Sequence, residues 1–205
     1  THLYRTGRLA EGASLTAITA EIASKFKIET ELLPMTDDKV STFVTLAESG
    51  DEVSFQEYFV KMRHSVPVSA IRFDGVEKSQ PGPNVIKSIL DAEKVVIAPS
   101  NPLVSIGPIL AIAEINSAIQ SRRESTVAIS PIIDGLALKG PADRMMSELG
   151  HEPSVLGIAH FYKEFAATLV IDHADKKHKK SIESIGMRCL VTDTVMSSPA
   201  ISASL

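Results

Sequence analysis

Residues 99–108 form a loop of small and polar side chains between a short apolar segment and an amphipathic one. A loop of this kind, entering a helix, presents backbone N–H groups at the positive end of the helix dipole, which suits a phosphate. Ser100, Asn101 and Ser105 add side-chain donors to the same loop. The sequence therefore predicts an anion-binding site here. The alternative is a rigid turn that only joins the strand to the helix.

A second loop mirrors the first after the next expected strand. Ser130 follows apolar residues 126–129, and Lys139 stands just before Gly140-Pro141, an ordinary helix entry. Two successive strand ends with Ser, Pro and Gly loops favour a paired phosphate or sugar site over either loop alone. Lys139 is a candidate mobile cation for that site, or else a surface lysine.

Two further groups of polar residues lie outside these loops. His2 and Arg5, three residues apart, share a helical face, where arginine can bind an anion and histidine can move a proton. The adjacent carboxylates of Asp37 and Asp38 could bind Mg²⁺ or orient a substrate hydroxyl. The alternative is a structural role in a turn or at a helix N-cap. The remaining histidines and Cys189 lack metal-ligand spacing, so no zinc site is predicted, and Cys189 is expected in the core.

Hydrophobic periodicity predicts the elements that position these residues. Strands are expected at 95–98, 126–130, 168–171 and 188–192, with helices at 108–120, 141–149, 155–165 and 177–185 between them. The stripe of the first of these helices consists of Ile109, Ile112, Ala113 and Ile119. This alternation predicts an α/β fold, a Rossmann-like three-layer sandwich whose mainly parallel sheet has helices on both faces. In such sheets ligands bind beyond the carboxyl ends of the strands.

The first half of the chain breaks this alternation. Ser14 is expected to cap a helix that buries Ile18 and Phe26, and strands are expected at 41–46 and 68–73. A helix at 54–62 has an apolar face of Phe55, Tyr58 and Phe59, and a further helix follows Gly82-Pro83. We predict one α/β domain over 1–205, with a possible inserted α+β subdomain at 31–80.

Composition excludes several classes of function. The chain has 205 residues, 44% of them hydrophobic, a net charge of −4 and one cysteine. The basic run at 176–180 follows acidic residues and is typical of a solvated helix face, so no nucleic-acid partner is expected. A single cysteine favours a reducing compartment, the cytoplasm, and no apolar run is long enough to span a bilayer. The sequence at Thr1 already has the pattern of a structured element, and residues 197–205 are typical of the start of a helix. We therefore expect a fragment that lacks N-terminal strands.

The motifs, taken in order, resemble the 2-phospho-L-lactate transferase family. The most specific part is PSNPLVSIGPIL at 99–110. Residues 1–6 (THLYRT), 12–16, 33–38 (LPMTDD), 130–133, 139–142 and 193–196 are similar to that family as well. The resemblance covers essentially the whole chain.

That resemblance implies a reaction of coenzyme F-420 biosynthesis. A guanosine-diphospho donor gives a 2-phospholactate unit, or phosphoenolpyruvate in bacterial members, to the ribityl hydroxyl of the deazaflavin Fo, and GMP leaves. Mg²⁺, small-molecule substrates and a homodimer are implied too. The residues carried over for the nucleotide are Ser100, Asn101, Ser105, Ile106, Gly107, Ser130 and Lys139. Thr6, Met35 and Thr36 are carried over for the deazaflavin, and His2, Arg5 and Asp37 for catalysis.

One departure from the family concerns the metal. The family begins with a strand and a Gly-Gly-Thr-Gly loop followed by acidic residues, none of which this sequence contains. The Mg²⁺ ligands are therefore expected in a part preceding Thr1, and a molecule that truly starts there is expected to be inactive. Phospholactate and phosphoenolpyruvate both stay open, and the metal ligands and the general base stay unassigned. The runner-up is a nucleotide-sugar-binding regulator from a sister family linked to gluconeogenic growth; an inert fragment is the third alternative.

Overall fold

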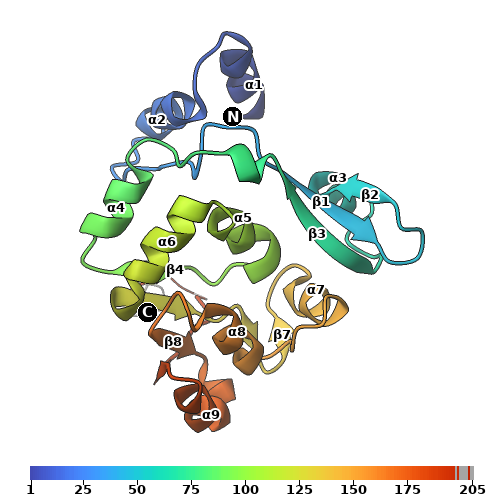
Figure 1. The fold of residues 1–205 in the computed structure, drawn as a ribbon, viewed down its shortest axis with the longest axis vertical. Coiled ribbons are helices and arrows are strands. Elements are labelled where there is room, and N and C mark those ends of the chain that lie inside the picture. Colours follow the sequence, from blue (N-terminus) through green and yellow to red (C-terminus); the bar gives the residue numbers. More distant parts are fainter. Residues whose placement is uncertain (197, 199–202, 204–205) are drawn as a thin grey trace.

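The computed structural model describes residues 1–196, 198 and 203, and Figure 1 shows their arrangement. A helical hairpin forms one end of the molecule, an antiparallel sheet stands to one side, and a parallel sheet lies behind the central helices. The helix start expected at 197–205 falls outside the described residues except for Ser198 and Ala203. The two loops predicted to bind the nucleotide belong to the part that contains the parallel sheet.

The parallel sheet consists of β4 (Val95–Ile97), β5 (Thr126–Ile129), β8 (Thr168–Ile171) and β9 (Arg188–Val191), in the order β4-β5-β8-β9. The four strands predicted from the sequence are confirmed, each to within about one residue at its ends. Ile97, Ala128, Leu169 and Cys189 stand in register across it, and each is at most 6% exposed. Cys189 is thus a core residue, as predicted, and burial raises the pKa of its thiol.

The connections between these strands carry the helices. After β4 come a π-helix η2 (Pro102–Ile106), α5 (Gly107–Leu110), α6 (Ala113–Ser121) and a 3₁₀ turn η3 (Arg123–Ser125). A small hairpin of β6 (Ile132–Ile133) and β7 (Leu136–Ala137) precedes α7 (Ala142–Glu148) and α8 (Val155–Tyr162). The 3₁₀ helix η4 (His173–His178) and α9 (Lys179–Ser184) join β8 to β9. All four lysines at 176–180 are exposed, as expected of a solvated face.

The prediction of helices on both faces of this sheet is not confirmed for the described residues. The strand order runs without reversal, and right-handed crossovers then place every connecting helix on the same side. Figure 1 shows α6 and α8 in front of the sheet. On the opposite face Val96 is 59% exposed and Leu190 is 55% exposed. On that same face Val170 of the central strand β8 is only 6% exposed, so the third layer stays a prediction.

The helix predicted at 108–120 is interrupted. It breaks between α5 and α6, and the segments Pro102–Leu110 and Ala113–Ser121 meet at 95°. The Asn116 side-chain amide donates to the Leu110 carbonyl at 2.9 Å, which satisfies an acceptor at the end of α5. Ile112 and Ile119 are buried as expected, whereas Ala113 is exposed. Within the described residues no single helix is long and apolar enough to cross a membrane. The two segments of this bent pair reach the required length and composition only when they are taken together.

The helical hairpin consists of α1 (His2–Ala10) and α2 (Leu15–Lys25). Ser14 caps α2 as predicted, since its hydroxyl oxygen accepts from Ala17 N–H at 3.2 Å. Ile18 is fully buried, but Phe26 follows the last helical residue and is 67% exposed, against expectation. The Arg8 guanidinium of α1 donates to the Glu21 carboxylate of α2 at 2.9 Å and so joins the two helices. This contact holds the pKa of the Glu21 carboxyl well below its ordinary value.

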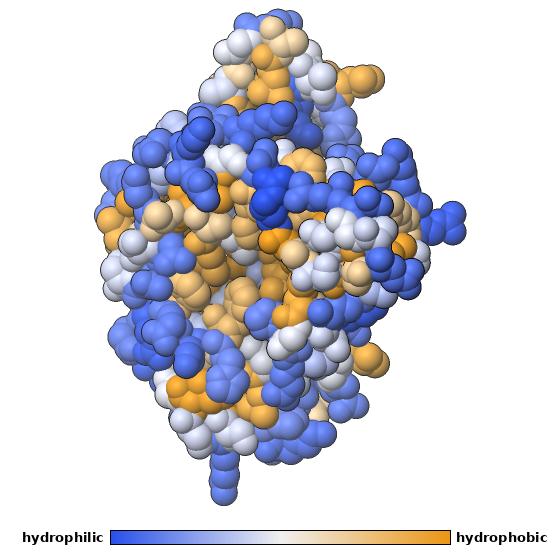
Figure 2. Space-filling view, turned by 45° about the vertical axis from the view of Figure 1, so that its right-hand side comes forward, coloured by the Kyte–Doolittle hydropathy of each residue, from blue (hydrophilic) through white to orange (hydrophobic). Residues whose placement is uncertain are grey.

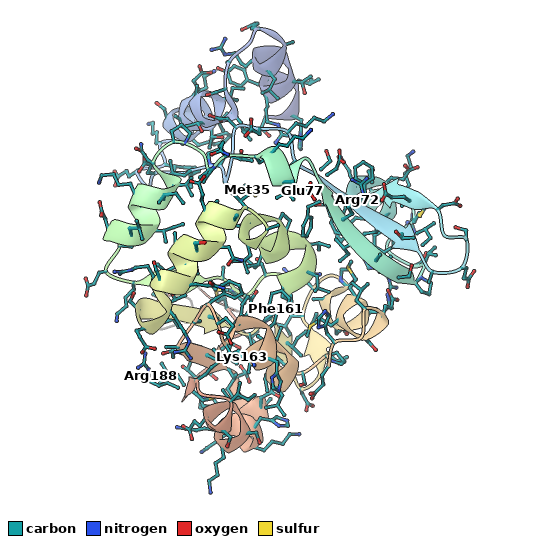
Figure 3. All side chains as sticks on the ribbon, viewed as in Figure 1. Met35, Arg72, Glu77, Phe161, Lys163 and Arg188 are labelled. Carbon is teal, nitrogen blue, oxygen red and sulfur yellow. The ribbon has the colours of Figure 1, made fainter. Side chains whose placement is uncertain are left out.

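The segment 31–80 contains a second, antiparallel sheet, with the order β2-β1-β3. Its strands are β1 (Ser41–Leu46), β2 (Glu52–Ser54) and β3 (Val68–Asp74), followed by η1 (Val76–Lys78) and α4 (Val85–Asp91). The strands expected at 41–46 and 68–73 are confirmed, while the sequence pattern does not predict the three-residue β2. Arg72, labelled in Figure 3, reaches from β3 to the Glu52 carboxylate with two hydrogen bonds of 2.6 and 3.0 Å. Between β2 and β3 lies α3 (Phe55–Val60).

Candidate functional site

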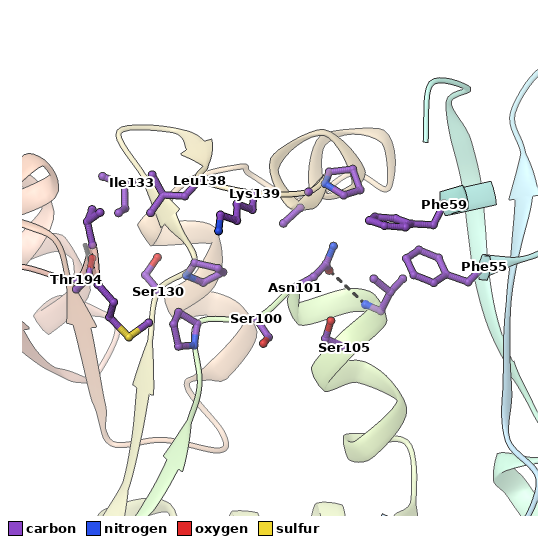
Figure 4. A pocket seen from close by; sticks show the side chains of 18 residues that line it. Phe55, Phe59, Ser100, Asn101, Ser105, Ser130, Ile133, Leu138, Lys139 and Thr194 are labelled. Atoms are coloured by element: carbon purple, nitrogen blue, oxygen red, sulfur yellow. Dashed lines mark hydrogen bonds between the residues drawn. The ribbon is translucent and has the colours of Figure 1, made fainter. Parts of the chain in front are cut away.

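A pocket of about 550 Å³ lies at the carboxyl ends of the parallel strands (Figure 4). Ser100 enters it after β4, Ser130 after β5 and Thr194 after β9. This is the edge at which a parallel sheet is expected to bind ligands. The polar lining side chains are Ser100, Asn101, Ser105, Ser130, Lys139 and Thr194.

Five of the seven residues predicted for the nucleotide line this pocket together, and the other two do not. Ser100, Asn101, Ser105, Ser130 and Lys139 surround it. Ile106 packs against the hydrophobic core instead. At Gly107 an added Cβ would lie 3.1 Å from the Phe73 ring, so the glycine allows α5 to approach β3 closely. The sequence thus predicts which loops meet, and the turn of the helix decides which members face the pocket.

Asn101 organises the first loop. Its side-chain oxygen accepts from Leu103 N–H at 2.9 Å and from Val104 N–H at 3.3 Å, which caps η2. Its backbone carbonyl accepts from Ser105 N–H and Ile106 N–H. The expectation that this loop presents free backbone N–H groups is therefore wrong for these four residues. The part of Asn101 that remains for a ligand is its side-chain NH₂ group, whose one contact is with the Met145 sulfur at 3.9 Å.

Ser100, Ser105 and Lys139 provide donors that are free to bind a ligand. Their side chains have no hydrogen-bond partner within the part of the chain that the structure describes. Lys139 is the one charged side chain among the described lining residues, which include no carboxylate. Figure 4 shows Lys139 extending over the space between Ser100 and Ser130. A pocket with several donors and a lysine is suited to an anionic group.

Ser130 has a structural task. Its hydroxyl donates to the Ile132 carbonyl at 2.9 Å and accepts from Ile132 N–H at 3.1 Å, and the residue is 2% exposed. The hydroxyl therefore closes the turn that leads from β5 into the β6–β7 hairpin. Ser130 lines the pocket, but its hydrogen-bonding capacity is largely used by its own loop.

Asp172, at the end of β8, holds the Thr194 segment against the pocket. One carboxylate oxygen accepts from Thr194 N–H at 3.0 Å and from the Thr194 hydroxyl at 3.2 Å, and the other accepts from Ala174 N–H at 3.0 Å. Partial burial of Asp172 opposes its ionisation, but these hydrogen bonds together outweigh it and lower the pKa of the carboxyl. In the sequence, Thr194 stands out only as part of a family-like motif.

We expect Asp172→Asn to destabilise the protein by about 1–2 kcal/mol at neutral pH, because charged hydrogen bonds are lost. A lowered folded-state pKa gives stability that is complete above the unfolded pKa of about 3.9 and is lost as pH falls through the folded value. Urea unfolding from pH 7 to pH 3 should thus show a constant difference from wild type above about pH 5 and a shrinking one below about pH 4. A difference independent of pH would contradict this assignment.

Two phenylalanines form the opposite wall. Ser54 caps α3 by accepting from Glu57 N–H at 3.2 Å, and the helix then directs Phe55 and Phe59 toward the pocket, with ring centroids 5.7 Å apart. The sequence predicts these rings as a core-facing stripe with Tyr58, but only Tyr58 is fully buried and Phe59 is 42% exposed. The sequence contains one sign of this aromatic wall, since three of the chain's ten aromatic residues fall within residues 55–59.

Arg144 of α7 fixes α3 in this place. Its guanidinium donates to the Tyr58 hydroxyl at 2.6 Å and to the His64 carbonyl, and it pairs with Glu148 at 2.9 Å. Glu148 in turn accepts from Val68 N–H at 3.0 Å. Burial raises the pKa of the Tyr58 hydroxyl, so the group stays protonated. These contacts join the antiparallel part to the parallel part beside the pocket.

The residues predicted for catalysis and for the deazaflavin do not line the pocket. His2, Arg5 and Thr6 are exposed on α1, which contacts α2. Asp37 accepts from Thr16 N–H at 2.6 Å, within the first turn of α2. Their proposed roles stay predictions.

Met35 and Thr36 belong to the loop that crosses above α5 in Figure 3. The Met35 carbonyl accepts from Gly82 N–H, and Thr36 is 3% exposed with its hydroxyl oxygen accepting from Asp38 N–H. Both residues thus help to hold this loop in place. Their role toward the deazaflavin likewise stays a prediction.

The described residues do not form a Mg²⁺ site. Across 1–196, 198 and 203, no three His, Cys, Asp or Glu side chains are placed to hold a metal. The adjacent carboxylates of Asp37 and Asp38 accept from Thr16 N–H and from Gln80 N–H, respectively. A magnesium site needs several oxygen ligands around one point, so no reaction step is assigned to the ion.

A second cavity, of about 530 Å³, is lined mainly by apolar side chains of β3, α5 and α8. Figure 2 shows apolar atoms gathered in a hollow on the face where these elements meet. Its lining includes Phe73, Phe161 and His151 but no group of polar donors. The first pocket therefore remains the candidate site.

Comparison with known proteins identifies a family. Residues 1–197 match the family model described as 2-phospho-L-lactate transferase CofD. A 2-phospho-L-lactate transferase of Methanosarcina mazei is 34% identical over 205 residues, which is all of this chain and 66% of the relative. A phosphoenolpyruvate transferase of Streptomyces griseus is 34% identical over 208 residues, 65% of its length. The chain thus spans just under two thirds of the length of these relatives.

Among solved structures, a UPF0052-family protein of Bacillus halodurans superposes with a TM-score of 0.64 at 14% identity. The match covers 96% of this chain and 66% of that one. At this identity the likeness concerns the fold alone. It does not favour the regulator alternative, whereas the named relatives are transferases.

Proposed function

Because the chain belongs to the 2-phospho-L-lactate transferase family, we propose that it binds a guanosine-diphospho donor in the first pocket and takes part in transfer of a phosphorylated three-carbon acid to the deazaflavin Fo. The single observation that carries this proposal is the set of donors at the strand ends. Ser100, Asn101, Ser105 and Lys139 meet there without a competing carboxylate among the described lining residues.

The proposed reaction is a substitution at phosphorus. The ribityl hydroxyl oxygen of Fo forms a bond to the phosphorus that carries the three-carbon acid, and the bond from that phosphorus to the oxygen of GMP breaks. The hydroxyl proton goes to a base and GMP leaves with the negative charge. Lys139 and the hydroxyls of Ser100 and Ser105 would bind the diphosphate, neutralise charge and hold the donor in line.

The described lining residues include neither a carboxylate nor a histidine, so the pocket binds and orients the donor and the base comes from elsewhere. His2, Arg5 and Asp37 remain the residues that the family resemblance carries over for catalysis, and none of them is assigned as this base. Mg²⁺ and a homodimer belong to the proposal on the same ground, and a cytoplasmic location belongs to it because a single cysteine favours a reducing compartment. Light scattering at micromolar concentration measures the mass, and a monomer would contradict the dimer.

The transferred unit is a phosphorylated three-carbon acid, either phospholactate or phosphoenolpyruvate. The two relatives are named for different units, and the chain is 34% identical to each. A direct test supplies the protein with Fo, Mg²⁺ and each guanosine-diphospho donor in turn, and follows GMP and the modified deazaflavin by mass spectrometry. Formation of both products from one donor supports the proposal. A folded protein that forms neither product from either donor, at any Fo concentration tested, contradicts it for this chain.

A further inference from the structure

We infer that Phe55 and Phe59 form the wall against which the planar base of the bound nucleotide stacks. This inference rests on the proposed function, because it assumes that a nucleoside diphosphate occupies the first pocket. It adds a subsite that the two strand-end loops do not contain, since both rings come from α3, in the segment that breaks the strand–helix alternation.

The pocket has a polar part and an aromatic part. Ser100 and Lys139 lie in the loops that follow β4 and β7, while the two rings stand on the far side of Asn101 (Figure 4). At about 550 Å³ the pocket is far larger than a phosphate group requires. A ligand with a diphosphate at one end and a flat ring at the other matches this distribution of side chains.

The Phe59 ring is available for a ligand. It is 42% exposed although it borders a pocket, and an exposed aromatic ring beside polar donors is a common feature of ligand sites. Bases stack on aromatic rings through their π-faces with little dependence on sequence, so a purine suits this wall.

The wall is also held in place before any ligand binds. The His64 ring packs on Phe59 with centroids 5.2 Å apart, and the Tyr58 ring packs on Phe55 at 6.1 Å. Both supporting residues are themselves fixed from α7, because the Arg144 guanidinium donates to the Tyr58 hydroxyl and to the His64 carbonyl. A ring positioned in this way loses little conformational freedom on binding, which favours affinity.

The test compares ligands with and without a base. Calorimetric titration of the folded chain with GDP and with inorganic diphosphate is repeated for Phe59→Ala, Phe59→Trp and Val60→Ala. Val60 is a matched control because it neighbours Phe59 on α3, is 64% exposed and does not line the pocket. We expect Phe59→Ala to weaken GDP binding about tenfold, with diphosphate binding unchanged, since one stacking contact is lost. Phe59→Trp and Val60→Ala should bind GDP as the wild type does.

The outcomes separate the wall from the pocket. If the wild type binds GDP and Phe59→Ala binds it equally well, the stacking wall is refuted and the proposed donor pocket stands. The wall is refuted as well if Phe59→Ala weakens GDP and diphosphate alike, or weakens binding of Fo in place of GDP. If the folded wild type binds neither GDP nor diphosphate, the donor pocket itself fails and the wall fails with it.

Discussion

Asn101→Asp is expected to weaken GDP binding by about 100-fold or more while leaving the fold as stable as the wild type. The aspartate keeps an oxygen that can accept from Leu103 N–H and Val104 N–H, and a negative charge at a helix start is favourable. It removes the amide donor and puts a negative charge beside the diphosphate, which together cost about 3 kcal/mol or more of binding. Calorimetric titration and urea unfolding measure the two effects.

The matched variant for this experiment is Asn101→Ala. It loses both the cap and the amide donor without adding a charge, so we expect about 1 kcal/mol of lost stability and about a tenfold loss of GDP affinity. Asn101→Asp should therefore be the more stable of the two variants and the one that binds GDP more weakly. If Asn101→Asp binds GDP as tightly as the wild type does, the diphosphate does not lie beside Asn101.

Arg144→Met should lower the free energy of unfolding by about 3 kcal/mol, because it leaves several partners without their donor. The Tyr58 hydroxyl, the His64 carbonyl and the Glu148 carboxylate all face this guanidinium. Urea unfolding measures the loss. GDP affinity of the folded variant should fall as well, since α3 is no longer held beside the pocket.

Two further variants control this result. Tyr58→Phe removes one partner only and should cost about 1 kcal/mol. Arg144→Lys keeps the charge for Glu148 but cannot reach all three partners, so its stability should lie between the wild type and Arg144→Met. A loss of stability in Arg144→Met no greater than in Tyr58→Phe would show that the network does not join the two sheets.

Apart from β2, the strands of both sheets could be predicted from the sequence because their signal is local. Short apolar runs and period-two alternation depend on neighbouring residues, and they locate β1, β3 and all four parallel strands. The faces of the parallel sheet could not be predicted in this way. Which face a helix covers depends on strand order, and the order β4-β5-β8-β9 is set by tertiary contacts.

The candidate site could be predicted in part for the same reason. Ser100, Asn101 and Ser130 follow strands directly, so their meeting at one sheet edge follows from a parallel sheet. Gly107 points away from the pocket because of the preceding π-helix, whose wider turn the sequence pattern does not reveal. The pattern assigns Phe59 to the core because an apolar stripe gives no sign of whether its partner is protein or ligand.

The most direct test of the central claim is a calorimetric titration of the folded chain with GDP, run beside Lys139→Ala. Lys139 is exposed and has no partner in the described part, so its replacement should leave stability unchanged. We predict saturable binding at one site per chain, weakened about tenfold or more in Lys139→Ala because a charge-assisted contact is lost. Absence of GDP binding, or equal affinity in both proteins, would contradict the assignment of this pocket to the nucleotide.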